Sequence, residues 1–484
     1  RLQRDESFIT AWLFSGPYLK EQTGGDGLFD VPFAPELPDG DALWRLMPEG
    51  AISPPGICNL LAVDRGDNRC AYLKAELIAD RSGTAVAVVH VGARRDNPDC
   101  PTGATAVSRD IFEVARDPAV QVLVELIGGT TVARELVETA LRSGKHVVTA
   151  NKALIAEAGN ELFALAAEHG VALRYEAAVA GGIPIIKALR EGLSGNRIQW
   201  LAGIINGTGN FILTEMSEKG RDFPDVLAEA QALGYAEADP TFDVEGIDAA
   251  HKLVILASLA FGTPLAIDAV YAEGITRLTP DDLCYAEELG YRVKHLGVAK
   301  QSDAGIELRV HPTLIPEGRL LANVNGVKNA VLVEGDAVGP TLYYGAGAGA
   351  DPTASAVVAD IVDLARELGA GQQCPVPSLG VAASALKTQP YVPMAEVVTP
   401  WYLRMEAEDR PGVMSQVTSL LSEQGISIEA LIQKAPAEGE ARVPVIVLTN
   451  AARQAALEAA VDSIESLDTI TGSIARIRVE TLDG

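Results

Sequence analysis

Residues 234–252 read GYAEADPTFDVEGIDAAHK and place five carboxylates ahead of a single lysine. The apolar run LVILASLAF follows directly, which predicts a buried helix over 247–261. On that helix Asp248 and Lys252 lie four residues apart and share one face. An exposed pair of this kind contributes only about 0.3–0.5 kcal/mol, whereas a buried pair is costly unless it has a purpose.

A buried lysine beside a carboxylate can perform acid–base chemistry. The ammonium group can give a proton to a reacting oxygen, and an acid one turn away would orient it and keep it charged. The alternative is a structural ion pair at a helix start, and spacing does not decide between them. Glu237 and Asp243 suit either a substrate ammonium group or a solvated loop, and Asp239 can simply shape the turn before Pro240.

Composition narrows the class of protein. The chain has 484 residues and 48% apolar content, which predicts about three domains. A net charge of −26 disfavours nucleic acid and anionic membrane partners and favours a small-molecule substrate. Five cysteines without a CxxC pair indicate a reducing compartment. The longest apolar stretch, 253–267, is too short to cross a bilayer, so we expect a cytoplasmic protein.

The elements that position the acids begin at residue 71. Strand-like runs at 84–93, 120–129, 146–150 and 171–179 alternate with helical patterns at 71–80, 131–145 and 152–170. This order predicts an α/β fold with a doubly wound, Rossmann-like parallel sheet, and a nucleotide-binding domain over 71–182. Residues 1–70 contain seven prolines without clean periodicity, and no strand is predicted there.

The rest of the chain divides into three parts. Residues 183–345 mix strand and helix patterns and predict an α+β substrate-binding and dimerisation domain. Within 346–400, a helix from Thr353 returns to the nucleotide domain and a proline-containing linker follows. Residues 401–484 predict a compact βαββαβ unit, with Asp409 as the N-cap of its first helix.

The run from Ala230 to Lys252 resembles the signature of homoserine dehydrogenases. The resemblance extends over 71–390 through VELIGG, HVVTANKALIA, YEAAVAGGIPIIKALREGL, GIINGTGNFILTEM and YYGAGAGADPTASAVVADI, and the tail from 401 resembles an ACT domain. It implies hydride transfer between NAD(P) and the aspartate semialdehyde–homoserine pair. In that reaction Lys252 would donate the proton, Asp248 would bind substrate and orient the lysine, and Glu237 would hold the substrate amino group.

The resemblance also implies a cofactor site. Lys152 follows a predicted strand end, where ligands bind in doubly wound sheets. The positions assigned to the cofactor are Arg94, Arg95, Gly128, Lys152, Gly347 and Gly349. The two arginines suit the extra phosphate of NADP, while Asp96 beside them leaves NAD open. GAGAGA at 345–350 matches G-x-G-x-x-A literally, but no βαβ unit follows it.

One expected feature is missing. Before residue 71 the chain reads PPGICNLLAVDRGDNRC, with only Gly56 and Gly66, and no G-x-G-x-x-G can be drawn. We interpret the N-terminal sequence as altered relative to that of the family, in the way that a shifted reading frame in the coding DNA would alter it. The alternative function is therefore a catalytically impaired amino-acid sensor of the ACT type. A third hypothesis is another nicotinamide-dependent semialdehyde or amino-acid dehydrogenase on the same scaffold.

Two further ligands follow from the resemblance. YEAAVAGGIP matches the family's monovalent-cation loop, with Glu176, Val179, Gly181 and Ile183 as the expected ligands of Na⁺. From the residues alone, this stretch reads as a strand followed by a glycine turn. The ACT-like tail implies an amino-acid effector, with threonine expected, bound near the DRPG turn of a homodimer or homotetramer.

Overall fold

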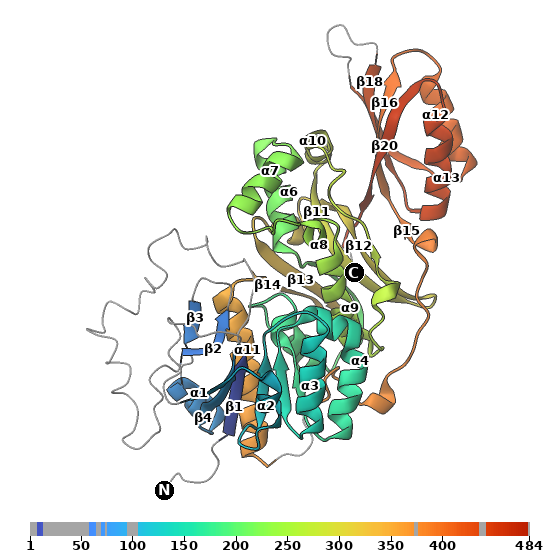
Figure 1. Cartoon of the computed structure of the whole chain (residues 1–484). Helices are drawn as coiled ribbons and strands as arrows, with labels where there is room; N and C mark the ends of the chain where they lie inside the picture. The colour runs from blue at the N-terminus through green and yellow to red at the C-terminus, as the bar shows by residue number, and fades with distance from the viewer. Residues whose placement is uncertain are drawn as a thin grey trace.

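The structure is a computed structural model that describes residues 7–12, 58–63, 69–72, 75–93, 105–371, 376–434 and 442–482. It contains two main sheets: one lies at the lower left of Figure 1, and the other extends from the middle of the molecule to the upper right. The predicted α/β class, with a doubly wound parallel sheet and a C-terminal βαββαβ unit, is confirmed.

The first sheet is parallel, with strand order β5-β4-β1-β6-β7-β8. Its strands are β1 (Ser7–Trp12), β4 (Val86–Gly92), β5 (Ala106–Ser108), β6 (Val122–Glu125), β7 (His146–Thr149) and β8 (Leu173–Arg174). This is the strand order of a classic dinucleotide-binding fold. The expectation of no strand in 1–70 was wrong, because β1 lies between β4 and β6. Its sequence, SFITAW, is rich in β-formers, but the run is short and does not alternate apolar and polar residues, which is the pattern of a half-buried strand.

Other short elements precede the regular part. Strands β2 (Cys58–Val63) and β3 (Arg69–Tyr72) pair antiparallel. The predicted helix over 71–80 is therefore displaced, since 69–72 is a strand and α1 is Ala75–Ser82.

Helices cover both faces of the first sheet. On one face lie α2 (Ile111–Arg116), α3 (Val132–Arg142) and α4 (Lys152–Glu168), and on the other α1 and α11 (Ala350–Gly369). α3 buries Ala133, Leu136, Val137 and Ala140, the i, i+3, i+4, i+7 stripe of an amphipathic helix. α11 comes from far along the chain and completes the core against β6 and β7.

The second sheet runs β14-β13-β9-β11-β12-β20-β16-β18-β17. Its strands are β9 (Ile198–Ile204), β11 (Tyr291–Ser302), β12 (Gly305–Pro316), β13 (Lys328–Gly335), β14 (Gly339–Ala346), β16 (Trp401–Glu408), β17 (Ile428–Gln433), β18 (Arg442–Thr449) and β20 (Ile470–Val479), with β10 (Tyr271–Ala272) beside β12. The parallel β12–β20 pair makes the C-terminal unit continuous with the central domain.

Helices of the central domain surround the candidate acids. They are α5 (Ile185–Lys187), α6 (Gly207–Lys219), α7 (Phe223–Ala232), α8 (Thr241–Val244), α9 (Ile247–Phe261) and α10 (Pro280–Glu288). α9 begins after Gly246 (φ +82°) and ends at Gly262 (φ +61°), left-handed positions that suit glycine. It packs between α4 and strands β11 and β12, so the predicted burial of this helix is confirmed.

The C-terminal unit carries α12 (Val413–Glu423) and α13 (Gln454–Glu465), and the short strands β15 (Val398–Thr399) and β19 (Ala452–Arg453) pair beside it. The N-cap prediction was wrong: Gly412, at φ +96°, takes that place. Asp409 lies three residues too early and accepts a hydrogen bond from Gln433 at 2.9 Å instead. None of the helices in the described ranges combines the length and apolarity needed to cross a bilayer.

Candidate active site

Asp248 lies at the centre of a buried polar cluster. Its Oδ2 accepts a hydrogen bond from the Lys252 ammonium at 2.7 Å, and its Oδ1 is 2.9 Å from the Lys152 ammonium. The Asp248 side chain is only 6% exposed and that of Lys252 only 11%. The helical spacing therefore pairs the two residues as predicted, and the surrounding core removes them from bulk water.

Lys252 is held by a second acceptor. Its Nζ also donates to the carbonyl of Ile205 at 2.8 Å, at the end of β9. With two oxygens fixing the ammonium, its remaining hydrogen can be offered to a substrate oxygen.

The charges in the cluster depend on one another. Burial alone would raise the pKa of Asp248, but the charges of Lys152 and Lys252 outweigh burial and hold that pKa below its usual value. The Asp248 carboxylate in turn raises the pKa of Lys152, with smaller contributions from Asp243 and Glu237. Asp248 therefore stays ionised and Lys152 stays charged at neutral pH.

Lys152 reaches the cluster from the first sheet. Asn151 caps α4, because its Oδ1 accepts from the Leu154 amide at 3.1 Å while its Nδ2 donates to the Gly129 carbonyl at 2.7 Å. Lys152 is thus the first residue of α4, at the carboxyl end of β7 where ligands bind in doubly wound sheets. Its side chain remains 34% exposed and lies 5.7 Å from the Phe242 ring, so it faces an open side of the cluster.

A buried glutamate that the sequence reasoning missed shapes the neighbouring loop. Glu125, at the end of β6, accepts from the amides of Ile127 at 2.8 Å and Gly128 at 3.1 Å. Its other oxygen accepts from Thr149 at 2.6 Å, which joins the ends of β6 and β7. A carboxylate inside the otherwise apolar strand VLVE was the available signal, because a buried charge needs partners.

Asn206 also escaped the sequence reasoning. Its Nδ2 donates to both Asp248 and Asp243, at 2.8 Å each. Burial, together with the charge of Asp248, raises the pKa of Asp243. The motif GIINGTGN contained this residue, but nothing in the local pattern indicates that it meets acids more than thirty residues later.

Glu237 lies at the exposed rim of the cluster and acts electrostatically on Lys152. Asp239 is exposed, and its side chain accepts from the Thr241 amide at 3.1 Å, so it shapes the turn. The structure therefore brings together Lys252, Asp248, Lys152 and Glu237, and leaves Asp239 in the turn.

Three regions of this chain match the models of known protein families. Family models described as "Homoserine dehydrogenase" match residues 184–362, "Homoserine dehydrogenase, NAD binding domain" 70–176, and "ACT domain" 401–466. A homoserine dehydrogenase of Pseudomonas aeruginosa is 59% identical, over 88% of this chain and 99% of the relative. The chain belongs to the homoserine dehydrogenase family.

Solved structures of homoserine dehydrogenases resemble this chain in sequence and in fold. A crystal structure of a homoserine dehydrogenase from Thiobacillus denitrificans is 56% identical, covers 85% of this chain and 94% of its own, and superposes with a TM-score of 0.81. A hyperthermophilic archaeal homoserine dehydrogenase mutant in complex with NADPH is 29% identical over 60% of this chain and 92% of its own, with a TM-score of 0.51. The oxidoreductase class, the NAD(P)-binding fold and the ACT domain are thus established for this chain.

Of the expected cofactor positions, the structure describes the three glycines but not the two arginines. Gly128 adopts φ +72° in the loop after β6, with its amide on Glu125. Gly347 has a packing reason of its own, because an added Cβ would lie 2.0 Å from the Asn329 side chain. Gly349, at φ +121°, is the residue before α11. Arg94 and Arg95, and the turn around Gly56 and Gly66, lie outside the described residues.

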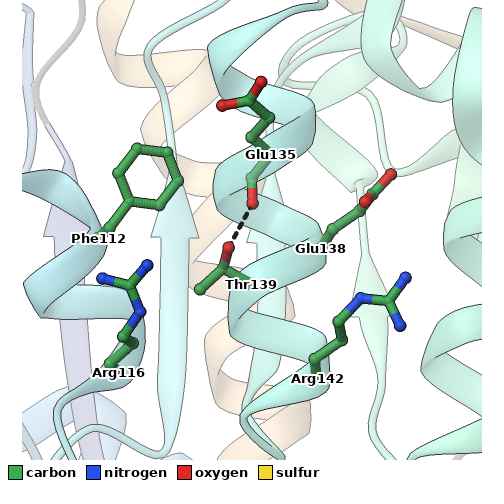
Figure 2. A pocket seen from close by; sticks show the side chains of 6 residues that line it. All are labelled: Phe112, Arg116, Glu135, Glu138, Thr139 and Arg142. Carbon is green, nitrogen blue, oxygen red and sulfur yellow. Dashed lines mark hydrogen bonds between the residues drawn. The ribbon is translucent and has the colours of Figure 1, made fainter.

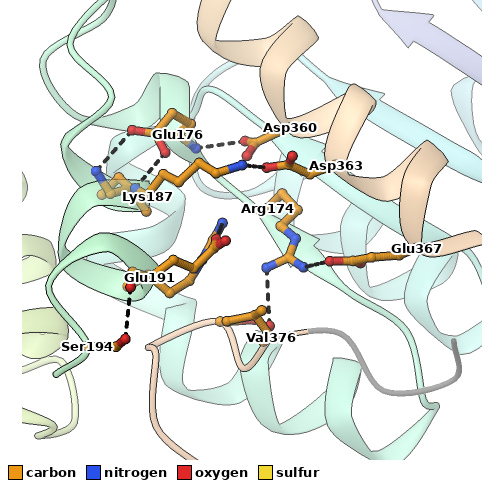
Figure 3. A network of polar contacts seen from close by, with 12 residues as sticks. Arg174, Glu176, Lys187, Glu191, Ser194, Asp360, Asp363, Glu367 and Val376 are labelled. Atoms are coloured by element: carbon orange, nitrogen blue, oxygen red, sulfur yellow. Dashed lines mark hydrogen bonds and ion pairs between the residues drawn. The ribbon is translucent and has the colours of Figure 1, made fainter. Parts of the chain in front are cut away.

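The expected cation loop is tightly bonded (Figure 3). The Glu176 carboxylate accepts from the Ile186 amide at 2.9 Å and the Lys187 amide at 2.8 Å. The Glu176 amide donates to Asp360 of α11 at 2.8 Å. Burial and the neighbouring Asp360 raise the pKa of Glu176 to about 8. Each carboxylate oxygen accepts one amide here and keeps a further lone pair, so Glu176 retains the capacity to bind a cation together with backbone carbonyls.

The described residues also form two hollows away from this cluster. A surface hollow of about 440 Å³ lies between α2 and α3, lined by Phe112, Arg116, Glu135, Glu138, Thr139 and Arg142 (Figure 2). A smaller one of about 190 Å³ lies where the linker segment 391–397 crosses Tyr271 and Arg309. Neither contains the catalytic candidates.

Proposed function

We propose that this chain interconverts L-aspartate 4-semialdehyde and L-homoserine, with Lys252 as the proton donor to the aldehyde oxygen. The observation that carries the proposal is the Asp248 carboxylate between two ammonium groups, that of Lys152 at the start of α4 and that of Lys252 on α9. A bound nicotinamide supplies or accepts the hydride. NADPH is favoured as the cofactor by its presence in the archaeal relative's structure.

The roles follow from the contacts. Asp248 directs Lys252, because the hydrogen bond between them fixes the position of the ammonium group that would act as the acid. Lys152, at the end of β7 and partly exposed, lies where it can contact both substrate and cofactor. Glu237, at the rim, offers a negative charge to the substrate ammonium group.

The test is NADPH oxidation with aspartate semialdehyde by Lys252→Ala. Loss of a general acid should reduce turnover by about 10²–10⁴-fold while the circular dichroism spectrum stays that of the wild type. Lys219→Ala is the matched control, since that lysine is 54% exposed on α6 and forms an i, i+4 ion pair with Glu215. Unchanged turnover in Lys252→Ala would refute the assigned role.

The same assay tests the competing functions. Comparing aspartate semialdehyde with other aldehydes separates this activity from that of another nicotinamide-dependent dehydrogenase. Fluorescence of NADPH on titration with the protein tests the impaired-sensor alternative. No binding at millimolar cofactor would favour the sensor, whereas the comparisons favour the enzyme.

We further propose regulation by an amino acid, with threonine as the expected effector. The support is a shared core: Tyr402 and Ile446 of the ACT sheet pack in one apolar cluster with Ile212 and Met216 of α6. Because α6 begins beside Asn206, a shift of the ACT sheet would reach the catalytic cluster. Inhibition by threonine but not by an unrelated amino acid such as lysine would support this route.

Two assembly features remain proposals. A Na⁺ ion held by Glu176, Val179, Gly181 and Ile183 would raise the thermal midpoint in NaCl relative to choline chloride. We also propose a homodimer or homotetramer, which would appear in light scattering after gel filtration. We also propose domain boundaries near residues 182, 345 and 400, which limited proteolysis can test.

A further inference from the structure

Asn206 occupies the only position in the described part of the chain from which one side chain bonds both Asp243 and Asp248. It is 5% exposed, at the junction of β9 and α6. Its Oδ1 accepts from the Gly209 amide at 2.7 Å and caps α6. The two hydrogens of its Nδ2 are divided between the two carboxylates.

This arrangement admits only one orientation of the amide. The Gly209 N–H needs an acceptor, and the two carboxylates need donors, so the oxygen must face α6 and the NH₂ group must face the acids. A helix cap needs only the oxygen, which serine or aspartate would supply equally well. The NH₂ group therefore does something that capping does not explain.

The NH₂ group defines the rotation of the Asp248 carboxylate. Asp248 Oδ2 accepts from both Asn206 and Lys252, which leaves Oδ1 for Lys152. The Ile205 carbonyl, one residue before Asn206, accepts from Lys252. Two consecutive residues at the end of β9 thus hold both members of the catalytic pair. The same NH₂ group also lies between two carboxylates that would otherwise repel each other.

We propose that Asn206 is a positioning residue for the reaction, which sets the orientation of Asp248 and through it that of Lys252. The inference rests on the proposed function, since it assigns Asn206 to the same reaction. It is distinct from a stability role, because the capping oxygen and the donating NH₂ group can be removed separately.

The experiment compares Asn206→Ser with Asn206→Asp in the full-length protein. Serine keeps a capping oxygen but has no NH₂ group and is too short to reach the acids. Aspartate keeps the capping oxygen and the shape of the side chain. It replaces the NH₂ group with a carboxylate oxygen, so that a third carboxylate lies beside Asp243 and Asp248. Asn196→Asp is the matched control, since that half-buried asparagine also caps a backbone amide, of Val338 at 3.0 Å, far from the cluster.

The expected result is a selective loss of catalysis. Asn206→Ser should lower kcat/KM about 10- to 100-fold, as for a lost hydrogen bond to a charged group, while the circular dichroism spectrum stays that of the folded wild type. Asn206→Asp should lose more activity and move the acidic limb of the pH–rate profile upwards, because a new negative charge makes Asp248 easier to protonate. Asn196→Asp should leave both measurements unchanged.

The groups that set this pH response come from every element around Asp248. They are Lys152 of α4, Asp243 of α8, His251 and Lys252 of α9, and Glu237 acting through Lys152. Asn206→Ser alters none of these charges, so any shift it causes in the acidic limb comes from the lost donor.

Two results would overturn the inference. Wild-type kcat/KM with a wild-type pH profile in Asn206→Ser would show that the residue only caps α6. If the wild type turns over no aspartate semialdehyde, the proposed function fails, and the inference is decided by ¹³C NMR titration of the Asp248 carboxyl. In that case an Asp248 pKa that is the same in Asn206→Ser as in the wild type would overturn the inference.

Discussion

Replacing Asp248 by asparagine keeps the side-chain volume and removes the charge that two lysines share. Breaking a buried ion pair typically costs about 3–5 kcal/mol, because the remaining charge is left unpaired. Lys252 is 11% exposed and would bear that cost, whereas Lys152 is 34% exposed and can turn towards water. We therefore expect Asp248→Asn to lower the free energy of unfolding by about 2–4 kcal/mol at pH 7.

The measurement is urea unfolding of the wild type, Asp248→Asn, Lys252→Met and the double variant. If the pair is coupled, the double variant should be less destabilised than the sum of the single variants, by about 2 kcal/mol. Asp239→Asn is the control, because that acid belongs to the same loop but is exposed. Strict additivity, or a change in Asp248→Asn no larger than that in Asp239→Asn, would refute the argument that the cluster is buried and interdependent.

Three further predictions concern positions outside the catalytic pair. Burial lowers the pKa of Lys294 from 10.5 to about 8, so the unfolded chain binds more protons between these values. Wild-type stability should therefore rise relative to Lys294→Met by about 3 kcal/mol from pH 8 to 10.5, and a flat difference in urea unfolding would contradict this. Gly347→Ala should destabilise by about 1–3 kcal/mol in thermal unfolding, because its Cβ would overlap Asn329; an unchanged midpoint would show that the loop can yield. Arg404→Met should lower the free energy of unfolding in urea by about 2–4 kcal/mol, because it removes the counter-charge of the buried Asp282 carboxylate. An unchanged free energy of unfolding would show that this ion pair between β16 and α10 contributes little to stability.

Much of the fold followed from local patterns. The apolar strands at 84–93 and 146–150 and the stripe of α3 identified a doubly wound sheet, because buried parallel strands and amphipathic helices have distinct periodicities. The predictions failed where local signals were weak. SFITAW does not alternate apolar and polar residues, and the DRPG turn contains both an acid and a glycine that could begin α12.

Part of the candidate site could likewise be predicted from local patterns, and part could not. Asp248 and Lys252 could be paired from their spacing, since residues four apart on a helix are neighbours. The family signature added Lys152 and Glu237. Asn206 could not be found, because the acids that it bonds lie on other elements and asparagine is common at helix caps. Glu125 could have been suspected from its place at the end of an apolar strand, but its partner Thr149 lies on another strand.

By itself, the sequence determined the helix that carries Asp248 and Lys252, the proposed catalytic pair, the alternation that builds the first sheet, and the family to which the chain belongs. Each of these depends on periodicity or on residues at short, fixed offsets. Only the tertiary structure decided that Lys152, 96 positions before Asp248 in the sequence, completes the charge balance of that acid, and that Asn206 links it to Asp243. Such contacts depend on how sheets and helices pack, and the strength of each charge depends on the water that this packing excludes.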